Sequence, residues 1–75
     1  MEPTIMFLQK IGANIKSIRK KKLIKQDTLA KGVGLTKSEI SRIENGKREI
    51  GVSKLAAIAG ILGTSIEAIL ETDKF

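Results

Sequence analysis

The sequence predicts an all-α domain of five short helices, and three observations support this. Apolar residues recur three and four positions apart along most of the chain, which is the spacing of amphipathic helices. No segment alternates apolar and polar residues with the period of two that marks a half-buried strand. Residues that end or begin helices, such as Gly34, Gly63 and Ser65, stand between the apolar stretches.

The first two helices are predicted from apolar stripes and from the residues that end them. The first helix fades within 20–22, and its stripe consists of Leu8, Ile11, Ile15 and Ile18. The second helix runs from Gln26 to about Val33, and its inward residues are Leu29, Ala30 and Val33. Gly34 follows at the place where a left-handed residue closes a helix.

The other three helices are predicted from caps and apolar faces. Thr36 and Glu39 have the spacing of a capping box, so the third helix begins there; its inward residues are Ile40 and Ile43, and it ends at Asn45-Gly46. Gly51 or Ser53 opens the fourth helix, which Gly63 ends. Its apolar face consists of Val52, Leu55, Ile58, Ala59 and Leu62. Ser65 caps a short fifth helix that carries Ile66, Ile69 and Leu70.

The composition excludes most kinds of catalytic site. The chain has no Cys and no His, which removes thiolate and imidazole metal ligands, disulfides, Cys nucleophiles and the side chain that most often acts as a general base. We therefore expect no enzyme, no metal and no cofactor. The absence of Tyr and Trp leaves little for base stacking, which weighs against single-stranded nucleic acid as the main target. With 75 residues, the chain is expected to form a single domain over 1–75 with a thin core.

The charge is uneven along the chain. Residues 1–48 hold 12 basic and 4 acidic side chains, whereas residues 49–75 hold 2 basic and 4 acidic ones. A basic part and a mildly acidic part predict one face for a polyanion and another face with a different task. The chain lacks an apolar run of the roughly 20 residues that cross a membrane. We expect a soluble, cytoplasmic protein that does not bind membranes.

The turn between the second and third helices, Gly34-Leu35-Thr36, is as short as a helix-turn-helix requires. With this turn, the residues Gln26, Leu29-Ala30, the run from Ile40 to Arg48, Leu55 and Leu62-Gly63 match a known family. On these residues, 11–70 resemble the Xre/Cro-type helix-turn-helix domain of the lambda-repressor-like fold. The helix-turn-helix would span about 26–46. Restriction–modification controller proteins look closest, followed by phage Cro-like repressors. Lys25 departs from the pattern, because the family usually carries a capping Ser or Thr there.

The resemblance implies which residues contact DNA. In this family the first turn of the third helix enters the major groove, which places Lys37, Ser38 and Arg42 at base edges. The residues implied to contact the DNA backbone are Gln26, Thr36, Ser41, Asn45, Lys47 and Arg48. For Glu39 two readings remain: a structural role in the capping box, which we favour, or acceptance of a hydrogen bond from a cytosine amine.

Two further sets of residues are expected to serve structure and assembly. The resemblance implies a partly buried ion pair between Arg19 and Glu44 that joins the first helix to the third. The C-terminal part, about 52–75, holds more apolar residues than two short helices bury within one chain. We therefore expect Ile61, Ile66 and Ile69 to form a two-fold dimer interface, which would set two recognition helices about 34 Å apart.

The function expected from the sequence is that of a DNA-binding transcriptional regulator. It would bind double-stranded DNA sequence-specifically as a homodimer on a palindromic operator, with RNA polymerase as a candidate further partner and no small-molecule ligand evident. The first alternative is an antitoxin that neutralises a toxin and binds its own promoter, although the chain offers no long tail to wrap one. The second is a nonspecific architectural protein, against which the polar face of the third helix weighs.

Overall fold

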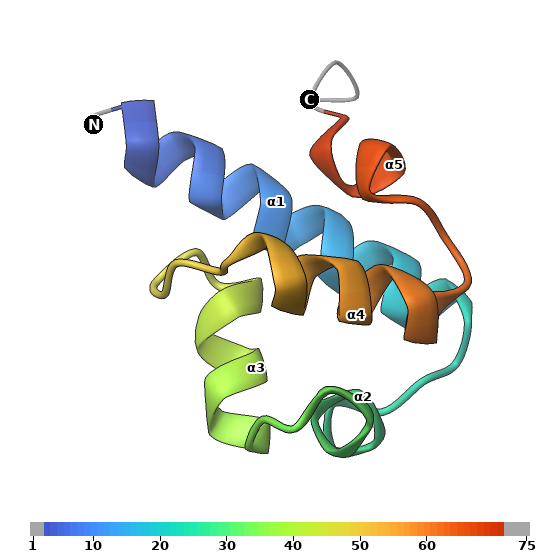
Figure 1. Ribbon diagram of the computed structural model, residues 1–75. Helices are drawn as coiled ribbons and strands as arrows, with labels where there is room; N and C mark the ends of the chain where they lie inside the picture. The colour runs from blue at the N-terminus through green and yellow to red at the C-terminus, as the bar shows by residue number, and fades with distance from the viewer. Residues whose placement is uncertain (1–2, 72–75) are drawn as a thin grey trace.

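The computed structural model describes residues 3–71, and five helices make up its regular structure (Figure 1). They are α1 (Pro3–Lys21), α2 (Gln26–Val33), α3 (Lys37–Glu44), α4 (Val52–Leu62) and α5 (Ile66–Leu70). The predicted all-α class with five helices is confirmed, and no strand occurs within the described residues. Positions 72–75 of the predicted dimerisation part lie outside the described residues.

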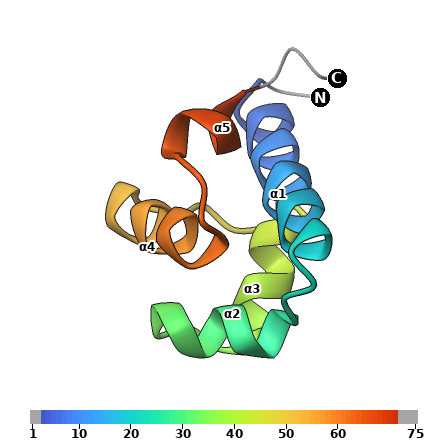
Figure 2. The ribbon, with the colours of Figure 1, turned by 90° about the vertical axis from the view of Figure 1, so that its right-hand side faces the viewer.

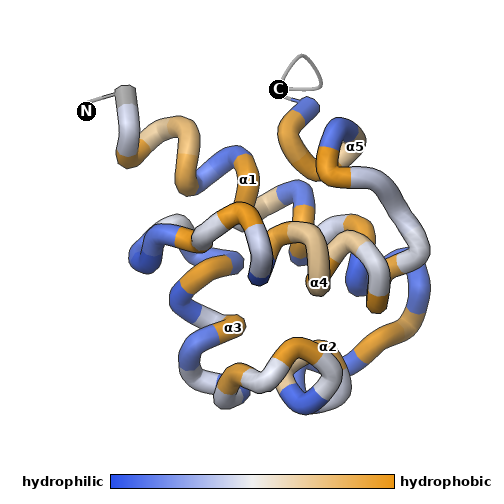
Figure 3. Tube along the Cα trace, viewed as in Figure 1, coloured by the Kyte–Doolittle hydropathy of each residue, from blue (hydrophilic) through white to orange (hydrophobic). Residues whose placement is uncertain are grey.

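The helices pack in a ring of pairwise contacts. α3 and α5 contact α1, α2 contacts both α3 and α4, and α4 also contacts α5. In two perpendicular views α2 lies at the end of the molecule opposite to α5 (Figures 1 and 2). The loop after α3 is mostly hydrophilic, whereas α4 is mostly apolar (Figure 3). The helix-turn-helix and the C-terminal helix therefore lie at opposite ends of the described structure (Figures 1 and 2).

Every helix contributes to a single core. The largest side chains that are fully buried are Ile15, Leu29, Ile40, Ile58, Leu62 and Ile69. Burial of one such side chain stabilises the fold by about 1.5–3 kcal/mol, so the loss of any single helix would remove a substantial part of the stability. Partly buried apolar side chains from the turns, among them Ile24 and Leu35, pack against the same cluster.

The helix ends follow the predicted caps. Thr36 and Glu39 form a complete capping box at the start of α3, and Ser65 accepts from the amide of Ala68 at the start of α5. Gly34 (φ 72°) and Gly63 (φ 65°) adopt the left-handed conformation that closes α2 and α4. Lys25 precedes α2 without a side-chain cap, as its departure from the family pattern suggested.

Two predicted placements of apolar residues are wrong. Val52 was expected on the inward face of α4, yet it is 77% exposed, because it is the first residue of the helix and the chain turns toward the core only at Leu55. Ile69 was expected between subunits, yet it is fully buried within this chain. α5 packs directly on α1, so Ile69 is needed for the intramolecular core and is not free for a partner.

Asn14 attaches the end of α5 to α1. This side chain is buried, and its Nδ2 donates to the main-chain oxygens of Ile69 and Glu71, each at 2.7 Å. Ile69 lies in the last turn of α5 and Glu71 directly follows the helix, so neither carbonyl has a partner inside the helix. The bonds therefore satisfy both the buried amide and the helix end. The apolar stripe of the first helix gave no signal for this contact.

Gly12 lets α1 and α3 approach closely. A Cβ at this position would lie 2.2 Å from the main-chain oxygen of Ile43 and 2.6 Å from that of Glu44. Because these are backbone atoms, a larger side chain would force the two helices apart. Gly60, in contrast, lies in α4 with open space where its Cβ would be.

We predict opposite effects of alanine at these two helical glycines. Gly12→Ala should lower the free energy of unfolding by about 1–3 kcal/mol, because α3 must move away from α1. Gly60→Ala should raise it by about 0.5–1 kcal/mol, because alanine is the better helix former. Urea unfolding of both variants checks this. A Gly12→Ala variant as stable as the wild type would contradict the close approach of the two helices.

Candidate nucleic-acid interface

The turn between α2 and α3 fixes the angle between these two helices. The amide of Leu35 donates to the oxygen of Ala30 at 2.9 Å, and the Leu35 side chain packs against the core. Ala30 is itself buried, and its small side chain permits the close crossing of the helices. The tight turn and the capping box together place the first turn of α3 at the surface.

One face of α3 is polar and exposed. Ile40, Ile43 and Glu44 are buried, whereas Lys37, Ser38 and Arg42 are exposed. Ser38 and Arg42 are four residues apart and therefore neighbours on the helix surface, and the Arg42 Nη2 lies 3.5 Å from the Ser38 Oγ. The three residues predicted to contact bases are thus all exposed to solvent on α3. Their hydrogen-bond donors are the Lys37 ammonium, the Ser38 hydroxyl and the Arg42 guanidinium.

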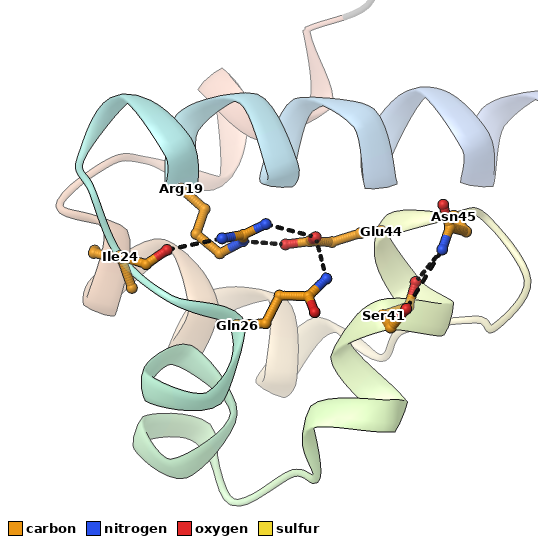
Figure 4. Close-up of polar contacts among 6 residues, drawn as sticks. All are labelled: Arg19, Ile24, Gln26, Ser41, Glu44 and Asn45. Atoms are coloured by element: carbon orange, nitrogen blue, oxygen red, sulfur yellow. Dashed lines mark hydrogen bonds and ion pairs between the residues drawn. The ribbon is translucent and has the colours of Figure 1, made fainter.

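Three of the residues predicted to contact the DNA backbone, Thr36, Asn45 and Lys47, lie at the ends of this face. Thr36 is exposed at the start of α3, and its hydroxyl accepts from the Glu39 amide at 3.1 Å. Asn45 ends the helix and donates from Nδ2 to the Ser41 main-chain oxygen at 2.9 Å (Figure 4). Lys47 is exposed in the loop that follows. These groups therefore lie at both ends of the α3 face.

Glu39 is engaged at both of its carboxylate oxygens. Oε1 accepts from the main-chain amide of Thr36 at 2.9 Å, and Oε2 accepts from Nη1 of Arg48, with which it forms an ion pair. The hydrogen bond from the Thr36 amide, followed by that from Arg48, lowers the pKa of the Glu39 carboxyl below its usual value. Of the two readings of Glu39, these contacts favour the structural one.

A buried polar network connects α1, α2 and α3 (Figure 4). The Nε of Arg19 lies 2.6 Å from Glu44 Oε2, and its Nη2 lies 3.1 Å from Oε1, so the guanidinium grips the carboxylate with two bonds. The Nη1 of Arg19 also donates to the Ile24 oxygen at 2.8 Å. The side chain of Glu44 is only 1% exposed.

Gln26 joins this network at the start of α2. Its Nε2 donates to Glu44 Oε1 at 2.9 Å, so the amide expected to bind phosphate is held by the same carboxylate that binds Arg19. The sequence resemblance included the pair of Arg19 and Glu44 but missed the contacts to Gln26 and Ile24. Among the described residues, no buried side-chain nitrogen or oxygen lacks a hydrogen-bond partner.

The three residues predicted at the dimer interface differ in exposure. Ile61 is 42% exposed on α4, and its Cδ1 would lie 2.9 Å from a Cβ at Gly32, so it covers part of α2. Ile66 is half-buried against the core. Ile69 is completely buried within this chain, so it cannot contact a second subunit. Ile61 and, to a lesser extent, Ile66 therefore remain available to a partner.

Other kinds of site find little support in the described part of the chain. Residues 3–71 contain no group of three or more His, Cys, Asp and Glu side chains that could hold a metal ion. Within the same residues, no helix combines the length and the apolar character needed to cross a membrane. The exposed polar surface around α3 is therefore the principal candidate site.

Comparison with known proteins places the chain among helix-turn-helix proteins. Residues 15–69 match the family model HTH_3, described as helix-turn-helix. The ImmF control region 10 kDa protein of Bacillus phage phi105 is 34% identical over 65 residues, which cover 87% of this chain and 72% of that protein. The immunity repressor protein of the same phage is 37% identical over 60 residues, which cover 80% of this chain and 42% of the repressor.

Solved structures show the same fold. The restriction-modification controller protein C.AhdI from Aeromonas hydrophila superposes with a TM-score of 0.79 at 27% sequence identity. The match covers 83% of this chain and 94% of the controller protein. The predicted likeness to lambda-repressor-like domains and to controller proteins is thereby confirmed.

We predict that the buried ion pair is far more important for stability than an exposed one. Arg19→Met should lower the free energy of unfolding by about 3–5 kcal/mol, because Glu44 would keep a buried charge without its main partner. Asp27→Asn, which removes the exposed pair between Asp27 and Lys31 in α2, should cost less than about 1 kcal/mol. Thermal and urea unfolding of both variants checks this, and similar losses would contradict the role of the network.

We also predict that the contribution of Glu39 to stability depends on pH. Its pKa in the folded protein is below the ordinary value of 4.5, so its contribution is present above that value and is lost as the pH falls through the folded-state pKa. The difference in melting temperature between the wild type and Glu39→Gln should be constant from about pH 7 to pH 5.5 and should shrink below about pH 4.5. A difference that grows on acidification would contradict this.

Proposed function

The chain belongs to the HTH_3 helix-turn-helix family, and we propose that it regulates transcription by binding double-stranded DNA sequence-specifically. The observation that carries the proposal is the exposed face of Lys37, Ser38 and Arg42 on a capped helix that follows a tight turn. Lysine and arginine can donate to the guanine acceptors in the major groove, and serine can donate or accept. Both phage relatives are named for an immunity control region or an immunity repressor, in agreement with such a role.

The remaining contacts in this proposal position the protein on the DNA backbone. The residues that we assign to backbone contacts are Gln26, Thr36, Ser41, Asn45, Lys47 and Arg48. Gln26 lies at the N-terminus of α2, where main-chain amides and the helix dipole favour a phosphate. The excess of basic side chains in residues 1–48 adds an attractive field that does not depend on sequence.

We further propose that the protein acts as a homodimer on a palindromic operator. α4 carries a single charged residue, Lys54, whose Nζ is engaged with the Val33 oxygen at 2.7 Å. The exposed side of α4 therefore displays Ile61, and Lys54 is the one charge on this helix that would have to be desolvated in a dimer interface. Half-buried Ile66 follows on α5. A two-fold pair through this part, about 52–75, would present two α3 helices to successive major grooves. A regulator of this kind would act in the cytoplasm, with RNA polymerase as a further partner.

The direct experiment is a salt titration of binding to a duplex selected from random DNA. Binding should weaken as salt rises, by about 0.9 log unit per log unit of salt for each phosphate neutralised. Far-UV circular dichroism should confirm that the protein is folded throughout. Affinity that does not change with salt, or selection that enriches no sequence, would contradict the proposed function.

Two alanine variants should separate base contacts from backbone contacts. Arg42→Ala should cost about 1–3 kcal/mol on the selected duplex and little on a scrambled one, with relaxed preference at one base pair per half-site. Lys47→Ala should weaken binding to both duplexes alike and reduce the salt slope by about one per subunit. Equal losses on both duplexes for Arg42→Ala would show that this side chain contacts only the backbone.

The proposed dimer can be tested at Ile61. Ile61→Lys should raise the dimer dissociation constant about tenfold or more, because two like charges would face each other across the two-fold axis. Leu23→Lys is the matched control, since Leu23 is 91% exposed in the turn between α1 and α2. Sedimentation at micromolar concentration measures both variants. A dimer that survives Ile61→Lys unchanged would move the interface elsewhere.

A further inference from the structure

The loop after α3 carries two neighbouring cations in different environments. Lys47 is exposed and forms no ion pair with any residue that the structure describes. The Arg48 guanidinium, in contrast, is bound to the carboxylate of Glu39. Glu39 is the third residue of α3, so Arg48 reaches back along the helix next to the face that we assign to DNA. A phosphate approaching this loop would therefore meet one uncompensated positive charge and one that is already neutralised.

Glu39 is held in place by its second contact. The Thr36 amide donates to Oε1, which fixes the carboxylate at the start of α3 and leaves Oε2 for Arg48. About a third of each partner's side chain is exposed, so the pair lies at the surface and its remaining guanidinium donors can reach solvent. The carboxylate thus restrains the position of Arg48 and cancels its charge without covering it.

We propose that Glu39 is a positioning residue that determines specificity through Arg48. Held by Glu39, Arg48 offers its remaining hydrogen-bond donors at one fixed place beside the start of α3. Because the pair is neutral, Arg48 releases few counterions and adds little to binding of unrelated DNA. This inference rests on the proposed DNA-binding function and assigns to Glu39 a role other than reading a base.

The variant Glu39→Gln separates the charge from the cap. Glutamine can accept from the Thr36 amide as glutamate does, so α3 should remain capped, while Arg48 loses its counter-charge. The salt slope should become steeper by about 0.9 per subunit, equivalent to about a threefold larger loss of affinity per subunit between 50 and 200 mM salt. Affinity for scrambled DNA should rise more than affinity for the selected duplex.

Glu49→Gln is the matched control. Glu49 is exposed, adjoins Arg48 in the chain and forms no ion pair with another residue of the described part. Its replacement by Gln changes the net charge by the same amount as Glu39→Gln. It should alter the salt slope much less than Glu39→Gln. If the wild type binds duplex DNA and the two variants give equal slopes, the inference fails while the proposed function stands. If the wild type itself does not bind, the proposed function fails.

The double variant Glu39→Gln with Arg48→Gln gives a second test. The pair has no net charge in the wild type and none in the double variant, so the salt slope should return to the wild-type value. A slope shallower than that of the wild type by about 0.9 per subunit would show that Arg48 already acts as a full cation and would overturn the inference. A changed base preference at one position in Glu39→Gln would also overturn it, in favour of direct readout by Glu39.

The restraint itself can be measured without DNA. Exchange of the Arg48 guanidinium protons with water, followed by nuclear magnetic resonance, should be slower in the wild type than in Glu39→Gln. Equal exchange rates would show that Glu39 does not hold the guanidinium in solution, which also overturns the inference. Melting curves establish that each variant is folded at the temperature of the measurement.

Discussion

The geometry of the helix-turn-helix depends on one buried carboxylate. Glu44 lies at the end of α3, is almost completely buried, and accepts from Arg19 of α1 and Gln26 of α2. A charge in such a place is tolerated only when its hydrogen-bonding capacity is met, and here it is met by groups from the two other helices. The three helices are therefore tied to one carboxylate, and no buried side-chain nitrogen or oxygen of the described residues lacks a hydrogen-bond partner. Gly12 supports this arrangement too, because the main chain of Ile43 and Glu44 in α3 approaches α1 at a distance that leaves no room for a Cβ.

The sequence was most informative where structure is local. The bounds of α2 and α3 follow from Gly34 and from the capping box of Thr36 and Glu39, whose interactions span four residues or fewer, so they could be read directly. Burial was harder to predict, because periodicity indicates which face of a helix is apolar and not what covers that face. Ile69 illustrates this limit: α5 appeared to have a face free for a partner, and α1 already covers it.

The polar contacts of the candidate site were predictable only in part. The pair of Arg19 and Glu44 was expected from family resemblance, whereas Gln26 reaches Glu44 across 18 positions and Asn14 reaches Ile69 across 55. No spacing rule connects residues so far apart. The ion pair of Glu39 and Arg48 was missed for a related reason: Glu39 was expected in the capping box or at a base and Arg48 on the DNA backbone, and only the path of the loop after α3 brings them together.

The way α5 is attached leaves its sequence free to diverge. Asn14 holds this helix through the main-chain oxygens of Ile69 and Glu71, and a carbonyl oxygen is present whatever side chain a residue carries. Apart from buried Ile69 and half-buried Ile66, the attachment therefore imposes little constraint on which residues α5 displays. Descendants of this sequence could change the outer surface of α5, and with it their choice of partner, while the bonds from Asn14 kept the helix anchored.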